Sequence, residues 1–229
     1  MWSQSDFWSE RMIQRIVLLH ATPVAVEPIQ DAFRRLWPEA EIVNLLDDGL
    51  TIDRNKSTEL SQELTDRFVR LGQYGAAMET DGLLITCSAF GPAIDVLESA
   101  LTIPVLRPNE AMFRAALENG KRIGMLATFA PAVVTMEAEF ATFRAYAGSD
   151  AVLETIIVPD AIEALRRGDA ETHNRLVGEY ASQLKHCDVI MLAHFSTSRA
   201  RAAVEAAVNV PVLAAPDAAV LRMRALVNA

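Results

Sequence analysis

Two side chains able to transfer protons stand at the ends of similar apolar runs. In the stretch LLITCSAFGP, Cys87 follows an apolar run and precedes small residues and a Gly-Pro break, and in VIMLAHFS, His194 follows a comparable run. A strand that ends in a turn opening a helix leaves backbone N–H groups free beside the side chain, which favours an anion. The pattern at Cys87 therefore predicts a site for a thiolate or a substrate carboxylate, with a buried and inert cysteine as the alternative.

The two stretches belong to an internal repeat. A shift of 107 positions, the separation of His194 from Cys87, also superimposes residues at or near strand starts: Arg122 on Arg15, Asp188 on Asp81 and Pro211 on Pro104. One constant offset predicts two structurally similar halves, each the size of a small α/β domain. With pseudo-two-fold symmetry, Cys87 and His194 would face each other across the cleft between the halves.

Strands and helices are expected to alternate along the chain. The expected strands are 15–20, 41–46, the run ending at 87, 103–106, 122–127, 152–158, 189–193 and 212–214. The expected helices are 26–37, 58–78, 92–101, 110–119, 133–146, 160–167, 170–185, 199–208 and one from 218, with 47–49 as a turn. Residues 1–14 are expected to form a lead-in from which Trp2 and Phe7 dock on the surface.

This alternation predicts an α/β fold with parallel sheets and right-handed crossovers. We expect two similar three-layer αβα domains of flavodoxin or Rossmann type, related by pseudo-two-fold symmetry, with the active site in the cleft between them. The first domain should span residues 1–107 and the second 108–214, with the C-terminal helix 215–229 packing back on the first. Hydrophobic residues make up 51% of the chain, which fits strands buried on both faces.

Composition excludes several functional classes. The net charge of −9 and the lack of clustered Lys and Arg argue against nucleic acid, and no glycine-rich phosphate motif supports nucleotide chemistry. No apolar run reaches the roughly 18 residues of a membrane span, and the first residues lack signal-peptide features. We therefore expect a cytoplasmic protein with no membrane partner. Two cysteines are too few for a disulfide framework. Separately, we expect the protein to form a homodimer or a higher homo-oligomer.

Candidate binding residues follow the strands, because ligands bind beyond the carboxyl ends of parallel strands. They are Thr22, Asp47, Ser88, Thr128, Phe129, Phe195 and Ser196. Asp47 is most simply part of a turn, although its carboxylate could orient a substrate ammonium group. The hydroxyls could bind a substrate carboxylate or merely cap turns. No metal is expected, because the close spacing typical of zinc ligands is absent among His20, His194 and Cys87. Cys187 precedes a strand and is expected to be structural.

The T-C-S-x-x-G context of Thr86 to Gly91, the duplicated halves and the strand ending at His194 resemble the aspartate/glutamate/hydantoin racemase superfamily over nearly the whole chain. The superfamily includes maleate isomerase and arylmalonate decarboxylase. The resemblance implies catalysis without any cofactor, in which two cysteines flank the substrate α-carbon as acid and base. It matches Cys87 to the first of these cysteines and places Ser88 and Ala89 beside the substrate carboxylate, with Thr22 and Thr128 in loops that line the cleft.

His194 stands where a two-cysteine member carries its second cysteine. A Cys/His pair could still run a two-base reaction, since histidine also transfers protons near neutral pH. Alternatively, His194 only binds a carboxylate or orients Cys87, which leaves one-base chemistry. We therefore expect a cofactor-independent racemase or isomerase acting on a small carboxylate or hydantoin-like substrate. A single-cysteine decarboxylase or lyase and a non-catalytic binding protein are the alternatives.

Overall fold

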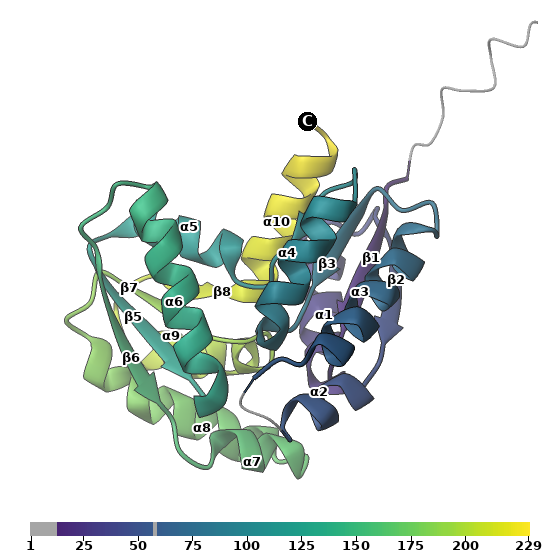
Figure 1. Cartoon of the computed structure of the whole chain (residues 1–229). Helices are drawn as coiled ribbons and strands as arrows, with labels where there is room; N and C mark the ends of the chain where they lie inside the picture. The colour runs from purple at the N-terminus through teal and green to yellow at the C-terminus, as the bar shows by residue number, and fades with distance from the viewer. Residues whose placement is uncertain (1–12, 57–58) are drawn as a thin grey trace, which may run out of the picture.

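The structure is a computed structural model that describes residues 13–56 and 59–229, so the expected docking of Trp2 and Phe7 lies outside the described residues. Two four-stranded parallel sheets, ordered β2-β1-β3-β4 and β6-β5-β7-β8, share one topology and confirm the expected α/β fold. Figure 1 shows the two sheets on either side of the C-terminal helix α10. The strands are β1 (Arg15–His20), β2 (Glu41–Leu46), β3 (Gly82–Ile85), β4 (Val105–Leu106), β5 (Arg122–Ala127), β6 (Val152–Ile157), β7 (Val189–Leu192) and β8 (Val212–Ala214).

Helices connect successive strands in both halves. They are α1 (Val26–Leu36), α2 (Gly49–Arg54), α3 (Gln62–Ala76), α4 (Gly91–Ala100), α5 (Glu110–Asn119), α6 (Ala130–Tyr146), α7 (Ala161–Arg166), α8 (Ala170–Ala181), α9 (Arg201–Ala207) and α10 (Ala215–Val227). Short 3-10 turns precede α4 at Ser88–Phe90 and α9 at Ser196–Ala200. No helix in the described part of the chain is both long enough and apolar enough to cross a bilayer.

The hydrophobic core has three parts because successive side chains of a strand point to opposite faces. In β1, Val17 and Leu19 pack with residues of α3 and α4, whereas Ile16 and Leu18 face a central core. That central core also contains residues of α1, α5, α6, α10 and the second sheet, so it joins the two halves. Residues of α8 and α9 cover the outer face of the second sheet. Helix α10, which follows the last strand of the second half, contacts both α1 and β3 in the first.

The 107-residue repeat extends to individual hydrogen bonds. The Asp81 carboxylate accepts from the backbone N–H of Arg15 at 2.7 Å, and the Asp188 carboxylate accepts from that of Arg122 at 2.8 Å. Backbone bonds repeat likewise, from Leu83 to Pro104 O at 2.8 Å and from Ile190 to Pro211 O at 2.9 Å. The offset therefore relates equivalent positions in two sheets of the same construction.

Several expected helix boundaries were wrong. The Asp-Asp-Gly sequence, typical of a turn, opens the short helix α2. Helix α3 begins at Gln62 rather than near residue 58, because the Ser61 hydroxyl caps it by accepting from the Leu64 N–H. The helix expected over 170–185 ends at Ala181 in a 3-10 turn, and α10 begins at Ala215 with a proline in its first turn, where proline is tolerated.

Candidate active site

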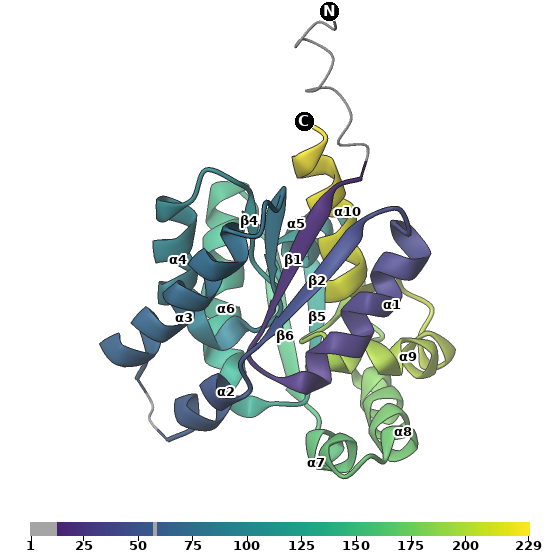
Figure 2. The same cartoon turned by 90° about the vertical axis from the view of Figure 1, so that its right-hand side faces the viewer.

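A cavity of about 370 Å³ lies between the two halves. Segments that follow seven of the described strands contribute to its wall, represented in chain order by Thr22, Thr51, Cys87, Asn109, Phe129, Ile162 and His194. Figure 2 shows α2 and α7, which follow β2 and β6, at the same end of the molecule. The cavity is therefore at the carboxyl ends of both sheets, where parallel α/β proteins bind ligands.

Cys87 enters this cavity from the first half, between β3 and the 3-10 turn that opens α4. Burial raises the pKa of its thiol, and a hydrogen bond from the Ala89 backbone and the charge of Arg54 oppose that rise without overcoming it. Arg54 on α2 also donates a hydrogen bond from Nε to the Ala89 carbonyl at 3.2 Å, which stabilises the turn that follows Cys87. In the free protein desolvation outweighs the single N–H donor and favours the thiol over the thiolate. The expectation that this turn binds an anion, a thiolate or a substrate carboxylate, stays a prediction.

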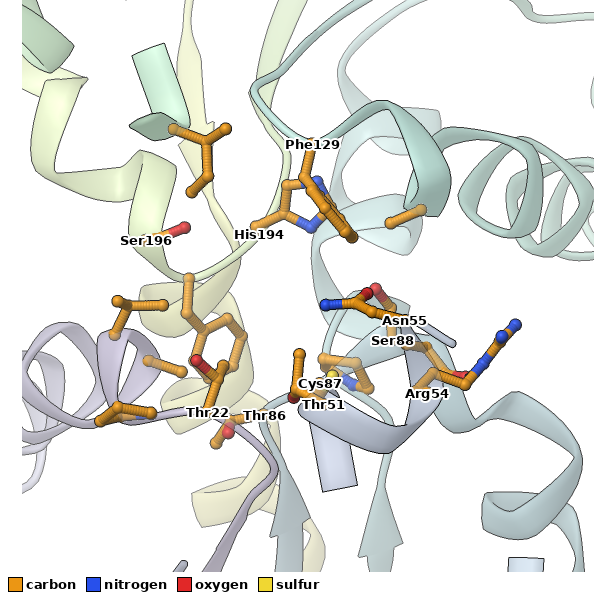
Figure 3. A pocket seen from close by; sticks show the side chains of 18 of the residues that line it. Thr22, Thr51, Arg54, Asn55, Thr86, Cys87, Ser88, Phe129, His194 and Ser196 are labelled. Carbon is orange, nitrogen blue, oxygen red and sulfur yellow. The ribbon is translucent and has the colours of Figure 1, made fainter. Parts of the chain in front are cut away.

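His194 enters the cavity from the second half. Figure 3 shows its imidazole beside Phe129, with Cys87 on the opposite side of the pocket. Its Nε2 atom is buried without a hydrogen-bond partner, and burial lowers the pKa of the imidazole to about 4. The backbone of His194 has a φ of +67°, whereas Cys87 is extended with a φ of −130°. The repeat thus places the two residues at equivalent positions but gives them different backbone conformations.

Most of the other expected site residues also line the cavity: Thr22, Ser88, Ala89, Phe129, Phe195 and Ser196. Asp47 and Thr128 do not line it. The Asp47 carboxylate is held by two hydrogen bonds from Arg67 on α3, at 2.6 and 2.8 Å, and so is not available to orient a substrate ammonium group. The Thr128 side chain is buried, and its hydroxyl is 3.4 Å from that of Thr197.

Sequence reasoning missed several residues of the cavity wall, among them Thr51, Arg54, Asn55, Asn109 and Arg166. The two arginines are the cationic side chains of this wall, and Arg166 lies over the Phe129 ring at 5.6 Å. Three of the five lie on or just after α2, which was expected to be a turn. The sequence could have indicated these three residues, because they follow β2 and every segment that leaves the carboxyl end of a parallel strand is a candidate for the ligand site.

Beneath the Cys87 turn, His20 is fully buried and does not line the cavity. Its Nδ1 is 2.8 Å from the Thr86 hydroxyl and its Nε2 is 3.0 Å from Asn44 Oδ1, so His20 is a hydrogen-bonded structural residue. Cys187 is buried in the outer core of the second half. Among the described residues, one group of three side chains is close enough to share a metal: Glu154 on β6 with His186 and Cys187, which precede β7. None of the three lines the cavity.

Asn109 is an unusual member of the cavity wall. It occupies the N-cap position of α5, where asparagine normally caps, yet its side chain accepts no hydrogen bond from the helix. The residue is 1% exposed, and neither its Oδ1 nor its Nδ2 has a hydrogen-bond partner. The Asn109 side chain lies beside Glu139 on α6, and this interaction opposes the burial that raises the pKa of Glu139 to about 7.

The buried imidazole of His194 should make the protein less stable in mild acid. Between its ordinary pKa of 6.5 and the lowered value of about 4, the unfolded chain binds a proton that the folded chain does not, so stability falls as the pH falls through this window. The His194→Gln variant lacks this effect and should lose up to about 3 kcal/mol less unfolding free energy between pH 7 and pH 4. Urea denaturation at several pH values measures the difference, and parallel curves for the two proteins would contradict the lowered pKa.

Fold and site together define a two-halved α/β protein with one cysteine and one histidine in the cavity between its halves. The chain belongs to the Asp/Glu/Hydantoin racemase family, whose model matches residues 21–141, more than half of the chain. This match includes Cys87 and ends before His194, so the replacement of a second cysteine by His194 stays a prediction. No curated protein sequence is significantly similar to the chain.

Solved structures of racemases are similar in fold. A glutamate racemase from Bacillus anthracis has a TM-score of 0.72 and 16% identity, with 94% of this chain and 82% of that chain covered. An allantoin racemase from Klebsiella pneumoniae has a TM-score of 0.68 and 20% identity, over 94% and 88%. An aspartate racemase from Picrophilus torridus has a TM-score of 0.73 and 13% identity, over 94% of each chain. Membership of a racemase family supports an enzyme of the isomerase type.

Proposed function

We propose that this chain is a cofactor-independent racemase or isomerase that moves a proton at the carbon α to a carboxylate or carbonyl group of a small substrate. The observation that carries the proposal is the placement of Cys87 and His194, which occupy equivalent positions of the two halves and line one cavity between them. The expected cytoplasmic location and the expected homodimer or higher homo-oligomer stay predictions.

The protonation states of the pair favour one starting arrangement. Burial keeps the Cys87 thiol protonated and the His194 imidazole neutral near pH 7, since it raises the pKa of the first and lowers the pKa of the second. In one direction, His194 accepts the α-proton and the Cys87 thiol donates its proton to the opposite face of the carbanion, which leaves an imidazolium and a thiolate. In the other direction the thiolate removes the proton and the imidazolium returns one. Repeated turnover in one direction needs proton exchange with solvent to reset the pair.

The developing negative charge lies on the oxygen of the activated carboxylate or carbonyl. Donors in the cavity wall suit that charge: the hydroxyls of Ser88 and Ser196 and the guanidinium groups of Arg54 and Arg166. Donors that are already in place stabilise a charge that develops only in the transition state, which lowers the barrier. Thr128 contributes no donor in this scheme because its hydroxyl interacts with Thr197.

One observation favours a second candidate, a decarboxylase that uses Cys87 alone. A thiol whose pKa is raised by burial is protonated at neutral pH and can donate directly to the carbanion left when CO₂ departs. In that reaction His194 would bind or orient the substrate and would exchange no proton with it.

Deuterium incorporation measured by mass spectrometry tests the proposal. The protein is incubated in D₂O with amino acids, 5-substituted hydantoins, 2-substituted malonates and maleate. Label at an α-carbon without loss of mass supports the racemase or isomerase, whereas label accompanied by loss of CO₂ supports the decarboxylase. If none of these compounds becomes labelled, proton transfer at such substrates is contradicted, and the non-catalytic binding protein is favoured.

A further inference from the structure

Three side chains with metal-binding atoms lie close together toward the amino end of the second sheet. They are Glu154 on β6 and, in the turn before β7, His186 and Cys187, and their ligand atoms all lie within 4.8 Å of one another. The Nε2 atom of His186 is 2.8 Å from the Glu154 carboxylate. These two side chains are about half exposed, whereas Cys187 is buried in the outer core of the second half. The group is therefore open to solvent on one side and backed by the protein on the other.

A glycine makes room for the Cys187 thiol. Gly124 on β5 pairs with Glu154 in the parallel ladder between β5 and β6. A Cβ atom at residue 124 would lie 3.3 Å from the Cys187 Sγ and 2.9 Å from a methyl group of Leu184, both closer than ordinary van der Waals contact. Because Gly124 has no side chain, the thiol can lie against β5, next to the strand that carries Glu154.

The first half shows that this place in the fold does not need a metal-binding group. The 107-residue offset relates Gly124 to Val17, whose strand partner is Val43, and both valines belong to the outer core of the first half. The same offset relates Cys187 to Thr80, whose hydroxyl is within hydrogen-bonding distance of two backbone carbonyl groups, at 2.7 and 2.9 Å. Packed valines and a hydrogen-bonded threonine close the first half where the second half has a glycine, a carboxylate and a thiol.

The donor atoms of the group suit a borderline-soft divalent cation. Zn²⁺ takes thiolate, imidazole and carboxylate ligands, whereas Ca²⁺ and Mg²⁺ prefer oxygen ligands throughout. In a tetrahedral site with metal–ligand distances of about 2.0 Å, an imidazole nitrogen and a carboxylate oxygen are about 3.3 Å apart. The 2.8 Å separation of His186 and Glu154 must therefore widen slightly, which side chains exposed to solvent can do. The thiolate and the carboxylate together neutralise the charge of the ion.

The neighbouring charges largely cancel. Arg122 and Asp188 act on the Cys187 thiol in opposite directions, and the two side chains form an ion pair at 2.9 Å. The Asp188 carboxylate also accepts hydrogen bonds from the backbone N–H groups of Lys121 and Arg122, at 3.0 and 2.8 Å. Asp188 is therefore already occupied, which leaves the fourth position of a tetrahedral ion to water.

We propose that Glu154, His186 and Cys187 bind Zn²⁺ through the carboxylate, Nε2 and Sγ, with water as the fourth ligand. On binding, the thiol releases its proton to solvent. The ion would tie β6, an edge strand of the second sheet, to the start of β7. None of its ligands lines the active-site cavity, so the role of the ion is structural, and the proposal is independent of the proposed function.

Titration of the metal-free protein with Zn²⁺ and with Co²⁺ tests the site. We expect one equivalent of Zn²⁺ to bind and to raise the unfolding temperature by about 5–10 °C when free Zn²⁺ is 100 times the dissociation constant. Co²⁺ should give a thiolate-to-cobalt charge-transfer band. Cys187→Ala should abolish this band and weaken Zn²⁺ binding by about 100-fold or more, since even the loss of an outer-shell partner typically costs 10- to 100-fold. Cys87→Ala is the matched control and should keep both the band and the affinity.

Two exposed substitutions keep the test decisive even if Cys187→Ala folds poorly. His186→Gln and Glu154→Gln leave the buried thiol in place, so each should fold normally and bind Zn²⁺ at least about 10-fold more weakly. Unchanged Zn²⁺ affinity in both variants would overturn the site. A cobalt band that is lost in Cys87→Ala but persists in Cys187→Ala would place the ion in the active-site cavity instead and would also overturn it. Absence of the band and of any rise in unfolding temperature in the wild-type protein would have the same meaning.

Discussion

Replacing Cys87 by alanine should lower deuterium incorporation at the substrate α-carbon by about 10²- to 10⁴-fold. Cys87 is the proton-transfer group of the first half in both candidate reactions, and such groups typically contribute 10²- to 10⁴-fold. The fold should persist, because the side chain is small and only half-buried, lying at the cavity wall and packing against the edge of the first outer core. Exchange rates from mass spectrometry and a thermal unfolding curve measure the two effects.

Cys187→Ala is the matched control for this experiment. It removes the other thiol of the chain, which is buried in the outer core of the second half at the amino end of β7, opposite to the end that carries His194. This variant should retain exchange activity while losing some stability through the space it leaves in the core. An active Cys87→Ala protein, or equal loss of activity in both variants, would refute the catalytic role of Cys87.

Replacing His194 by glutamine separates the two candidate reactions. Glutamine can form hydrogen bonds but cannot transfer the proton, so a two-base racemase should lose interconversion of enantiomers by about 10²- to 10⁴-fold. Exchange without inversion should remain only at a low level, for the enantiomer whose α-proton faces Cys87, because removal of that proton needs the thiolate and burial keeps the thiol protonated. A single-cysteine decarboxylase should instead keep substantial activity. Chiral chromatography of the products, combined with mass spectrometry, distinguishes loss of inversion from loss of all exchange.

The backbone at residue 194 requires its own control. Its φ of +67° lies in the left-handed region, which asparagine tolerates better than most residues. His194→Asn should therefore fold with less backbone strain than His194→Gln while lacking the titratable group in the same way. Loss of inversion in both variants assigns the effect to the imidazole. Normal inversion in a well-folded His194→Asn protein would contradict a proton-transfer role for His194.

The sequence by itself determined the strand pattern, the two similar halves and the racemase resemblance. These follow from local signals, since apolar runs mark buried parallel strands and a constant offset marks a repeated unit. The same offset paired Cys87 with His194, and parallel topology then requires residues after the strands to gather at one end of each sheet. The family model matches residues 21–141, which confirms the resemblance to the racemase family.

Only the tertiary structure decided which side chains enter the cavity and in which state of charge. Asp47 follows a strand as expected but turns to Arg67, a residue on a later helix, and that pairing is invisible in the local sequence. The pKa of Cys87 is raised and that of His194 is lowered by burial, which depends on the folded structure around each side chain and not on its neighbours in the chain. Asn109 carries a common N-cap signature, and only its burial beside Glu139 distinguishes it from an ordinary helix cap.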